Sequence, residues 1–508
     1  MAKYLGLDLS TQSLSALIVD GETGQILIDE SINFGKDLPG YNAPNGFVKG
    51  DKEGEVFSSP LMWLDAADKL FTKLQQQTDL SSIRAIAGSG QQHATVYLNS
   101  NFKENISQLD SSKSLSQNLK SSLSREISPI WMDNSTSAEC QEIADAAGGS
   151  DNVLKVSGSI PIERFSGAQI RKFSKESPEA YSTTSDIHLA SSFFCSVMSG
   201  SNAPIDLGDG AGMNLLNLQN NDWDPTLIEA CAPDLGSKLP AANASSSYVN
   251  TINSYFVDKY GFSADTEVYV FSGDNPNSLI GCGGALPGTA VISLGTSDTF
   301  FAAMSNPVTD PNGFGHVFGN PASGYMSLIC FMNGSLTREK LKDHYKLDWD
   351  QFSEAISQEA DSILLPWLID EITPKASASK ESLQALESSQ ESTDIRKFVE
   401  GQFINMMINS EWMGEEINHI ILTGGASQND ALAQVIADVF NAKIERLAVT
   451  NSAALGAAMR AYQAATDADW KSVNSIFIKT DEGKSISPKP FKLSQKLEAY
   501  KALAALNS

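Results

Sequence analysis

Two short segments, far apart in the chain, share one pattern, and this repeat constrains the fold more than any other feature. Leu7–Ser13 (LDLSTQS) and Ile292–Asp298 (ISLGTSD) each join a buried-strand run to a turn of small hydroxyl or glycine residues. More strand-forming residues follow both turns. One explanation is chance similarity over so short a stretch. The other is a duplicated α/β fold with a cleft between its two halves.

Strand patterns and helix patterns alternate along the first part of the chain. A β-hairpin is predicted over Tyr4–Asp20, a further strand over Gln25–Asn33, a helix over Ser58–Gln77 and a buried strand over Ile83–Ala87. Helices that alternate with strands in this way predict an α/β fold, in which helices cover a sheet.

The second half of the chain ends in the same pattern. Ile417–Thr423 is predicted as a strand, GGAS as a tight turn and Asn429–Phe440 as a helix. The small residues of Ala454–Ala465 predict a helix that packs closely against a neighbour. Residues 101–125 are predicted as a surface excursion, and the Ser- and Glu-rich residues 377–393 as a mobile surface insertion.

Composition limits the class of protein and its partners. A chain of 508 residues predicts two to four domains, and 41% hydrophobic with 19% charged residues is typical of a globular protein. The net charge of −25 repels phosphate backbones and anionic lipid, so neither nucleic acid nor membrane is expected as a partner.

Cysteine usage and hydropathy predict where the protein resides. The 5 cysteines are an odd number without a CxxC pair, which favours buried, reduced thiols in a cytosolic protein. No basic segment followed by an apolar run opens the chain, and no run of about 18 apolar residues is present to span a bilayer. We therefore expect a cytoplasmic protein.

Three turns are candidates for binding a nucleotide. Ser10–Ser13, Gly295–Thr299 and Gly424–Ser427 each follow a predicted strand and offer backbone amides or hydroxyls to phosphate oxygens. A single glycine turn after a strand is usually only a turn, but three of them carry more weight. No GxxxxGK[ST] loop is present and no GxGxxG follows a strand, which argues against P-loop and Rossmann mechanisms.

Three acidic residues lie in or directly after apolar runs. Asp8 lies inside a predicted strand, Asp274 follows Val268–Phe271, and Asp133 follows the short predicted strand of SPIWMD. A carboxylate in such a place costs desolvation free energy unless it has a partner. Asp8 is a candidate magnesium-linked acid and Asp274 a candidate proton acceptor; a strand-terminating cap is the alternative for Asp274.

Other catalytic chemistries find little support. The 5 histidines do not show metal-ligand spacing, so a zinc site is not expected. His93, at a predicted strand end, is either a polyol-binding side chain or a structural histidine. No GxSxG motif is present, which argues against a serine hydrolase.

Taken together and in order, these motifs resemble one family. LGLDLSTQS, GSGQQH, PIWMD, SGDNPNSL, SLGTSD, ILTGGASQND and SAALGAA resemble the FGGY carbohydrate kinases, and within them the eukaryotic type of xylulokinase. IERFSGAQI, DLGDGAGMNLL and FMNGSLTREK share the resemblance, which extends from Tyr4 to about Ala464.

The resemblance implies an α/β fold of two actin-like, ribonuclease H-like domains with an interdomain cleft that closes on ATP and a sugar. It predicts an N-terminal, sugar-binding domain over residues 1–262 and a C-terminal, nucleotide-binding domain over 263–485. Residues 486–508 are predicted as a C-terminal helix that packs back on the N-terminal domain.

The resemblance also implies roles for individual residues. Asp274 matches the general base, and Asp8 the acid that helps to hold magnesium, through water. The sugar contacts carried over are His93, Arg164, Asp274, Asn275 and Gln92. The ATP contacts carried over are Thr11, Gln12, Gly295, Thr296, Trp349, Gly424, Gly425, Ala426 and Asn429. A core role is the alternative for Trp349.

Two departures from the wider family narrow the subgroup. FSGAQIRKF follows Arg164 where many members carry a Pro-Lys element and a tryptophan, and WMDNST lacks the arginine that often follows the acid. Both are shared in character with the eukaryotic type of xylulokinase. The expected activity is therefore ATP- and Mg²⁺-dependent phosphorylation of D-xylulose at its 5-hydroxyl, feeding the pentose phosphate pathway. Another ketose or polyol such as ribulose, and a non-catalytic nucleotide-binding protein, are the alternatives; the sequence does not indicate an oligomeric state.

Overall fold

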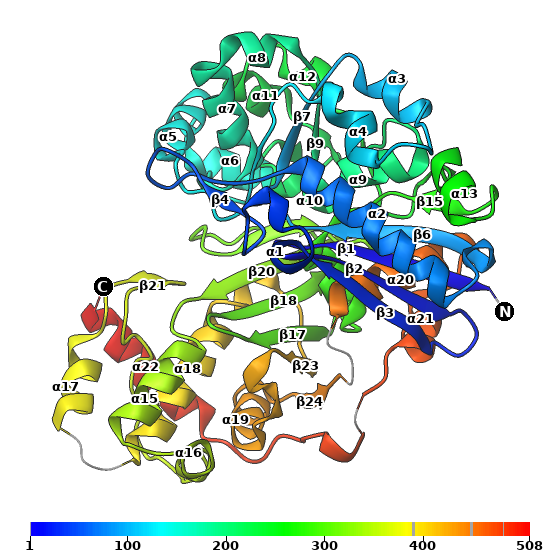
Figure 1. Ribbon diagram of the computed structural model, residues 1–508. Helices are drawn as coiled ribbons and strands as arrows, with labels where there is room; N and C mark the ends of the chain where they lie inside the picture. Colours follow the sequence, from blue (N-terminus) through cyan, green and yellow to red (C-terminus); the bar gives the residue numbers. More distant parts are fainter. Residues whose placement is uncertain (1, 389–391, 448–450, 481, 508) are drawn as a thin grey trace. The chain divides into compact units, whose positions relative to one another are not determined.

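The chain forms two compact units. The computed structural model describes residues 2–388, 392–447, 451–480 and 482–507 (Figure 1). Unit 1 comprises Met1–Ala285, Val317–Tyr325 and Asn451–Ile478, and unit 2 comprises Leu286–His316, Met326–Thr450 and Lys479–Ser508. Each unit is thus assembled from separate pieces of the chain. The domain limits expected at residues 262 and 485 stay predictions.

Unit 1 is built on a mixed sheet. Its described strands follow the order β14-β15-β6-β1-β2-β3, and β16 pairs with β6 beside β15. β1 runs antiparallel to β2 and parallel to β6, which confirms the predicted N-terminal hairpin. The strands are β1 (Lys3–Leu9), β2 (Ser13–Asp20), β3 (Ile26–Asn33), β6 (Ile83–Gly90), β14 (Tyr248–Thr251), β15 (Glu267–Tyr269) and β16 (Ser272–Gly273).

The two faces of β1 pack against different helices. Because side chains alternate along a strand, its odd-numbered leucines share one face, and they lie in the core with helix α2 (Pro60–Gln77). Gly6 and Asp8 share the other face. A Cβ at Gly6 would lie 2.0 Å from the carbonyl oxygen of Ala454, in α20 (Ser452–Thr466). Only glycine lets α20 lie so close to β1.

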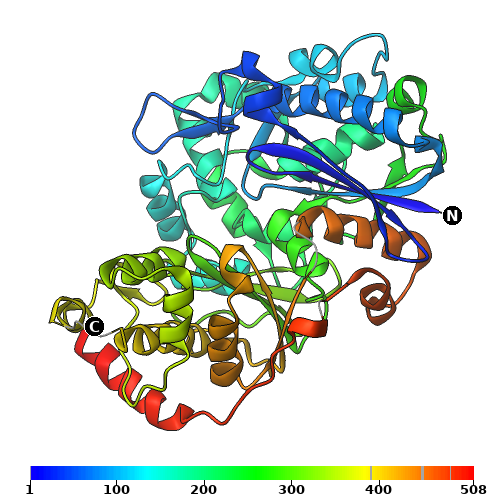
Figure 2. The ribbon, with the colours of Figure 1, turned by 60° about the horizontal axis from the view of Figure 1, so that its bottom comes forward.

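Helix α20 also packs tightly on α14 (Asp274–Gly281), the helix that begins with the candidate base. A Cβ at Gly456 would lie 1.9 Å from the carbonyl oxygen of Asn277, and one at Gly281 equally close to that of Ser452. Figure 2 shows α20, late in the chain, lying against the N-terminal strands. The predicted close packing of this small-residue helix is confirmed.

This contact makes a prediction for stability. Gly456→Val should destabilise unit 1 by roughly 3 kcal/mol or more, because a side chain there meets backbone that cannot move aside. Urea denaturation followed by circular dichroism measures the loss. Gly236→Ala, at a position whose nearest atom would lie 3.7 Å away, is the matched control and should change stability by less than about 1 kcal/mol. A stable Gly456→Val protein would contradict the packing described here.

A second hydrophobic cluster lies in the long insertion between β6 and β14, where β7 (Thr95–Asn99) pairs with β9 (Thr184–Leu189). The predicted excursion at residues 101–125 is anchored in the first cluster, which contains β1 and α2, by buried Phe102 and Leu115. Other short paired strands of unit 1 are β4 (Val48–Lys49), β5 (Val56–Ser58), β8 (Ser128–Pro129), β10 (Ile205–Asp206), β11 (Leu216–Asn217), β12 (Asp222–Trp223) and β13 (Ala242–Asn243). Its other helices are α1 (Phe34–Asp37), α3 (Phe102–Ser107), α4 (Leu115–Leu119), α5 (Ser137–Ala146), α6 (Ser150–Ser157), α7 (Ser166–Glu176), α8 (Pro178–Thr183), α9 (Ala190–Ser199), α10 (Leu207–Gly212), α11 (Pro225–Cys231), α12 (Leu235–Lys238), α13 (Ser254–Tyr260) and α21 (Trp470–Phe477).

Unit 2 repeats the plan of unit 1. Its strands follow the order β20-β18-β17-β23-β24, which is the order β3-β2-β1-β6-β15 of unit 1 with each strand replaced by its counterpart. β17 is antiparallel to β18 and parallel to β23, as β1 is to β2 and β6. The two similar sequence segments therefore form equivalent hairpins, which favours duplication over chance similarity. These five strands are β17 (Thr289–Leu294), β18 (Asp298–Met304), β20 (Tyr325–Phe331), β23 (His419–Thr423) and β24 (Lys443–Arg446). In sequence β19 (His316–Gly319) comes between β18 and β20, and β21 (Glu371–Ile372) pairs antiparallel with β22 (Lys375–Ala376).

The helices of unit 2 include one that the sequence did not predict. α17 (Lys380–Ser388) lies inside the segment expected to be a mobile insertion, and its Leu386 is buried. Residues 389–391 of that segment lie outside the described residues. α22 (Leu493–Asn507) packs on α18 (Asp394–Ile408) through Tyr500, whose hydroxyl donates to Asn405 at 2.7 Å; its packing on the N-terminal domain stays a prediction. The other helices are α15 (Ser335–His344), α16 (Trp349–Ile356) and α19 (Asp430–Phe440).

Among the described helices of both units, none combines the length and the apolar character that a bilayer crossing requires.

Candidate active site

Two carboxylates lie where neighbouring parallel strands of unit 1 end. Asp8 pairs in register with Ser89 of β6, and Asp274 directly follows β16, which pairs with the same end of β6. Burial raises the pKa of Asp8 to about 6. Burial, and secondarily the charge of Asp8, raise the pKa of Asp274 to about 7. Asp274 is thus a stronger base than an ordinary aspartate, which suits it to accept a proton from a hydroxyl.

An amide pair lies beside Asp274. The side-chain amide of Asn275 donates to Gln92 Oε1 at 2.8 Å, and its backbone N–H donates to Asp274 Oδ1 at 2.8 Å. The structure therefore joins three of the predicted sugar-site residues in one hydrogen-bonded group.

His93 and Arg164 meet at a third side chain, Phe165. The imidazole of His93 lies 4.6 Å from the Phe165 ring, and the Arg164 guanidinium lies 5.7 Å from it. His93 has a φ of 67°, and its Nδ1 lies 2.9 Å from the carbonyl oxygen of Gly212. A left-handed backbone is uncommon outside glycine and is often held at functional sites.

One acidic residue of this region was not singled out from the sequence. Asp209 of α10 is 2% exposed, and its Oδ1 lies 2.6 Å from the position that a Cβ would take at Gly273. Burial and the neighbouring Asp206 raise the pKa of Asp209 well above its usual range. The only sequence signal was the acidic DLGDGAGMNLL segment, and a spacing pattern does not show which of its two acids faces the site.

The turn after β1 carries two of the predicted ATP contacts. Thr11 accepts a hydrogen bond from Trp131 Nε1 at 2.9 Å and donates to Gln91 Oε1 at 3.3 Å, while Gln12 is exposed. The sequence did not predict the contact of Trp131 with Thr11. The Trp131 side chain is 45% exposed, so it is a surface aromatic residue that its hydrogen bond to Thr11 holds in place.

Asp133, the third acid, has a structural role. Its carboxylate is 1% exposed and accepts hydrogen bonds from the backbone of Val56, from Ser135 and from the Gln169 side chain. These donors lie at the start of β5, beside Asp133 and in α7, so the buried Asp133 carboxylate links these three segments.

In unit 2 the other candidate residues, except Gly424, line one cavity of about 680 Å³. Trp349 forms part of its wall and is 50% exposed, so the core role for this residue is excluded. Gly424 does not line the cavity; it has a φ of 87°, and a Cβ there would lie 2.7 Å from the carbonyl oxygen of Leu294. The lining residues are Leu294, Gly295, Thr296, Ser335, Leu336, Arg338, Glu339, Trp349, Gly425, Ala426, Asn429 and Leu432.

Asn429 fixes the wall of this cavity. Its Oδ1 accepts from the Leu432 backbone at 3.0 Å and so caps α19, while its Nδ2 donates to Ser353 of α16 at 2.8 Å. An exposed tryptophan face above a glycine turn and a helix start suits the flat ring and the phosphates of a nucleotide.

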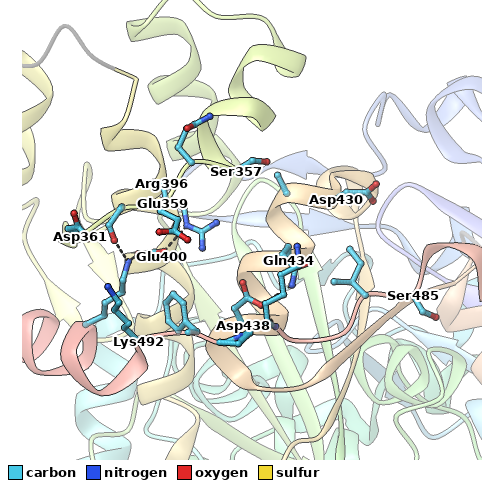
Figure 3. Close-up of a pocket in the computed structure, with 18 of the residues that line it drawn as sticks. Ser357, Glu359, Asp361, Arg396, Glu400, Asp430, Gln434, Asp438, Ser485 and Lys492 are labelled. Atoms are coloured by element: carbon cyan, nitrogen blue, oxygen red, sulfur yellow. Dashed lines mark hydrogen bonds and ion pairs between the residues drawn. The ribbon is translucent and has the colours of Figure 1, made fainter.

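A larger cavity of unit 2, of about 830 Å³, does not contain any of the predicted site residues (Figure 3). Charged side chains dominate its wall, and several are paired. Glu400 accepts from Arg396 at 2.6 Å and also pairs with Lys496, and Asp430 pairs with Arg446 at 2.7 Å. This mutual pairing makes the cavity a poor candidate for the catalytic site.

A magnesium ion fits Asp8 on chemical grounds. Asp8 Oδ1 is buried without a hydrogen-bond partner among the described residues, and Mg²⁺ prefers oxygen ligands. In the described part of the chain, three or more His, Cys, Asp or Glu side chains do not cluster as a metal site. Such a site suits an ion held by one carboxylate, water and a phosphate-bearing substrate.

The comparisons with known proteins decide the family. Residues 3–281 match the N-terminal domain, and residues 290–465 the C-terminal domain, of the FGGY family of carbohydrate kinases. The chain belongs to this family. FGGY carbohydrate kinases have the actin-like, ribonuclease H-like fold, so the predicted fold class of two such domains is confirmed. The family makes the chain a sugar kinase, whose substrates are a sugar and ATP.

Several curated relatives are similar over nearly the whole FGGY chain. Xylulose kinase of Mus musculus is 40% identical over 476 residues, covering 90% of this chain and 85% of that protein. Xylulose kinase 2 of Arabidopsis thaliana is 36% identical, covering 90% and 86%. Xylulose kinase of Schizosaccharomyces pombe is 34% identical, covering 95% and 93%.

Solved structures of FGGY kinases share the fold at low identity. Xylulose kinase from Rhodospirillum rubrum superposes with a TM-score of 0.82 at 17% identity, covering 99% of this chain and 98% of that one. Plasmodium falciparum glycerol kinase with ADP gives 0.79 at 18% identity, covering 100% and 98%.

The raised pKa of Asp274 predicts a dependence of stability on pH. The folded state holds the proton more tightly than the unfolded chain, so ionisation opposes folding increasingly from about pH 4 and fully above about pH 7. Asp274→Asn should therefore raise the free energy of unfolding at pH 8 by a few kcal/mol, and by less at pH 5.5. Thermal unfolding at the two pH values measures this. The exposed Asp29→Asn is the control, and equal shifts for both variants would refute the assignment.

The exposed face of Trp349 predicts a loss of nucleotide affinity on truncation. Trp349→Ala should weaken Mg–ADP binding about tenfold, since stacking of a base on an aromatic ring contributes ~1–3 kcal/mol. Isothermal titration calorimetry gives the Kd. Trp349→Phe keeps an aromatic face and should retain most of the affinity; if the alanine variant binds like the unaltered protein, Trp349 does not contact the base.

Proposed function

We propose that this FGGY kinase transfers the γ-phosphoryl group of ATP to the 5-hydroxyl of D-xylulose, giving D-xylulose 5-phosphate. The named relatives from mouse, plant and fission yeast support the sugar, because each is a xylulose kinase similar over at least 90% of this chain. The observation that carries the chemistry is Asp274, a partly buried carboxylate with a raised pKa beside an ordered amide pair.

In this proposal Asp274 is the general base. Its carboxylate takes the proton of the 5-hydroxyl while the hydroxyl oxygen attacks the γ-phosphorus. The bond from the γ-phosphorus to the bridging oxygen breaks, and ADP leaves with that electron pair. Phosphoryl transfer needs little covalent help from the protein, so one proton acceptor together with accurate positioning is sufficient.

The sugar is held by the polar groups around Asp274. Asn275 and Gln92 offer amide groups, and His93 and Arg164, which both lie close to the Phe165 ring, offer further donors. A site built on fixed donors and acceptors discriminates strongly against analogues that lack a matching hydroxyl, because its polar groups are then left unpaired.

The nucleotide is held mainly by unit 2. Gly295 and Thr296 face its phosphates, while Trp349, Gly424, Gly425, Ala426 and Asn429 form the adenosine side. Thr11 and Gln12, in the equivalent turn of unit 1, lie near the transferred phosphate. The cavity of about 680 Å³ supports the adenosine assignment, since all of these unit 2 residues except Gly424 line it.

Asp8 is the residue that would hold Mg²⁺, through water. The ion neutralises charge on the phosphates when it is bound. The five cysteines lie among the described residues and are not joined in disulfides, which agrees with the proposed cytoplasmic location.

The test of this function is release of ADP with Mg–ATP and one sugar at a time: D-xylulose, ribulose, fructose or glycerol. We expect a strong response to D-xylulose. A response to ribulose alone would move the activity to another ketose. ATP hydrolysis without a response to any sugar would indicate a non-catalytic relative or a different acceptor.

Replacement of the base tests the mechanism directly. Asp274→Asn should fold normally and lose about a thousandfold in kcat, since proton transfer of this kind contributes about 10²–10⁴-fold. Circular dichroism checks the fold and the coupled ADP assay measures kcat. Turnover near that of the unaltered enzyme would remove Asp274 from its proposed role.

A further inference from the structure

A buried ion pair stands behind the turn that lines the nucleotide cavity. Arg338 of α15 bonds to Asp298 through two parallel contacts, NH1 to Oδ2 at 2.7 Å and NH2 to Oδ1 at 2.8 Å. Their side chains are only 1% and 2% exposed. Asp298 is the first residue of β18 and directly follows the turn Gly295–Ser297. The pair therefore fixes the end of that turn.

The same arginine fixes the start of α15 against the turn. Arg338 NH2 donates to Ser335 Oγ at 2.8 Å, and the backbone N–H of Ser335 donates to the carbonyl oxygen of Gly295 at 3.2 Å. The next backbone N–H, of Leu336, points to Thr296 with a longer distance of 3.4 Å. With the two carbonyl oxygens of the turn occupied in this way, its conformation is set from behind.

A third contact ties Arg338 to α18. NH1 donates to Gln402 Oε1 at 3.2 Å, and Gln402 Nε2 donates to the carbonyl oxygen of Asn333 at 2.6 Å, just before α15. Four of the five N–H donors of the guanidinium are thus used inside the protein. Arg338 has little capacity left to bind a ligand itself, although it lines the cavity.

The pair is not an efficient stabiliser. Burial raises the pKa of Asp298, and the nearby Arg338 only partly opposes that effect. Burial of two charges costs desolvation free energy. When the attraction between them does not fully offset that cost, the ion pair is often no more stabilising than an apolar pair of the same volume. Its retention beside the nucleotide cavity points to a role in geometry.

We propose that Arg338 is a positioning residue for the nucleotide: through Asp298 and Ser335 it holds the Gly295–Thr296 turn in the shape that receives the phosphates. This inference rests on the proposed function, because it takes the cavity of unit 2 as the ATP site. Lysine cannot replace the arginine, since a single ammonium group does not span two carboxylate oxygens and a hydroxyl at once.

Three variants test the proposal. Arg338→Lys keeps the positive charge but loses the two parallel hydrogen bonds to Asp298. Arg338→Met leaves Asp298 without its ion partner and is the variant at risk of misfolding. The paired change Asp298→Leu with Arg338→Met removes both charges and should fold. For each we would measure Tm, Kd for Mg–ADP by calorimetry, and KM for ATP and for the sugar separately.

The expected result is selective. Arg338→Lys and the paired variant should raise KM for ATP and Kd for Mg–ADP about tenfold, a change typical of a displaced binding group, and leave KM for the sugar within about twofold. A purely structural role would lower Tm without separating the two KM values. Nucleotide affinity unchanged in the folded paired variant would overturn the proposal.

Lys496→Met is the matched control. Lys496 makes a buried ion pair with Glu400 in the same unit, far from the turn in sequence, and Glu400 keeps Arg396 as a partner when Lys496 is removed. This variant should lower Tm and leave both KM values unchanged. An equal rise of KM for ATP in the control would show that any loss of rigidity in unit 2 has the same effect. The proposal that Arg338 positions the nucleotide would then be wrong.

The two proposals fail in different ways. If the unaltered protein binds Mg–ADP but does not phosphorylate any of the sugars tested, the proposed function is wrong. The Kd values for Mg–ADP still test the role of Arg338 in that case. If the unaltered protein does not bind Mg–ADP, both proposals are wrong.

Discussion

The position of the candidate catalytic carboxylates, Asp8 and Asp274, depends on how closely α20 lies to the sheet of unit 1. Gly6 brings the helix onto β1, and Gly456 brings α14 onto the helix. Arg460 of α20 then donates to the carbonyl oxygens of Gly88 and Val270 and to the side chain of Asn277. One helix from the late part of the chain thus anchors the end of β6, the approach to β16 and the helix that begins with the candidate base.

This arrangement buries several acids with few cations. Asp8, Asp209 and Asp274 all have raised pKa values, and burial is the largest cause for each. Arg460, a buried cation of the region, donates to carbonyl and amide oxygens, and among the described residues it does not form an ion pair with a carboxylate. Burial of these ionised carboxylates lowers the stability of the folded protein, but it also raises their affinity for a proton. A general base that works near neutral pH requires this higher proton affinity.

The sequence predicted those features that arise from local patterns or from motifs. The strands on both sides of Asp8, the helix after Asn429 and the repeat of the two hairpins all followed from apolar periodicity and small-residue turns. Asp209 and the Arg338–Asp298 pair were not predicted, because each depends on segments that only folding brings together. Helix α17 was not predicted, because the composition of its segment is polar and gives little sign that Leu386 is buried.

The two equivalent hairpins differ at one telling position. Asp8 of β1 corresponds to Ser293 of β17, and the strands beside Ser293 present Thr299 and Thr423 in register with it. The strand and turn thus occur twice, but a carboxylate occurs at this position only once. One hairpin carries at this position a negative charge suited to a cation. The other carries hydroxyl groups there, and its Asp298 is paired with Arg338, so an anion can approach it with less repulsion.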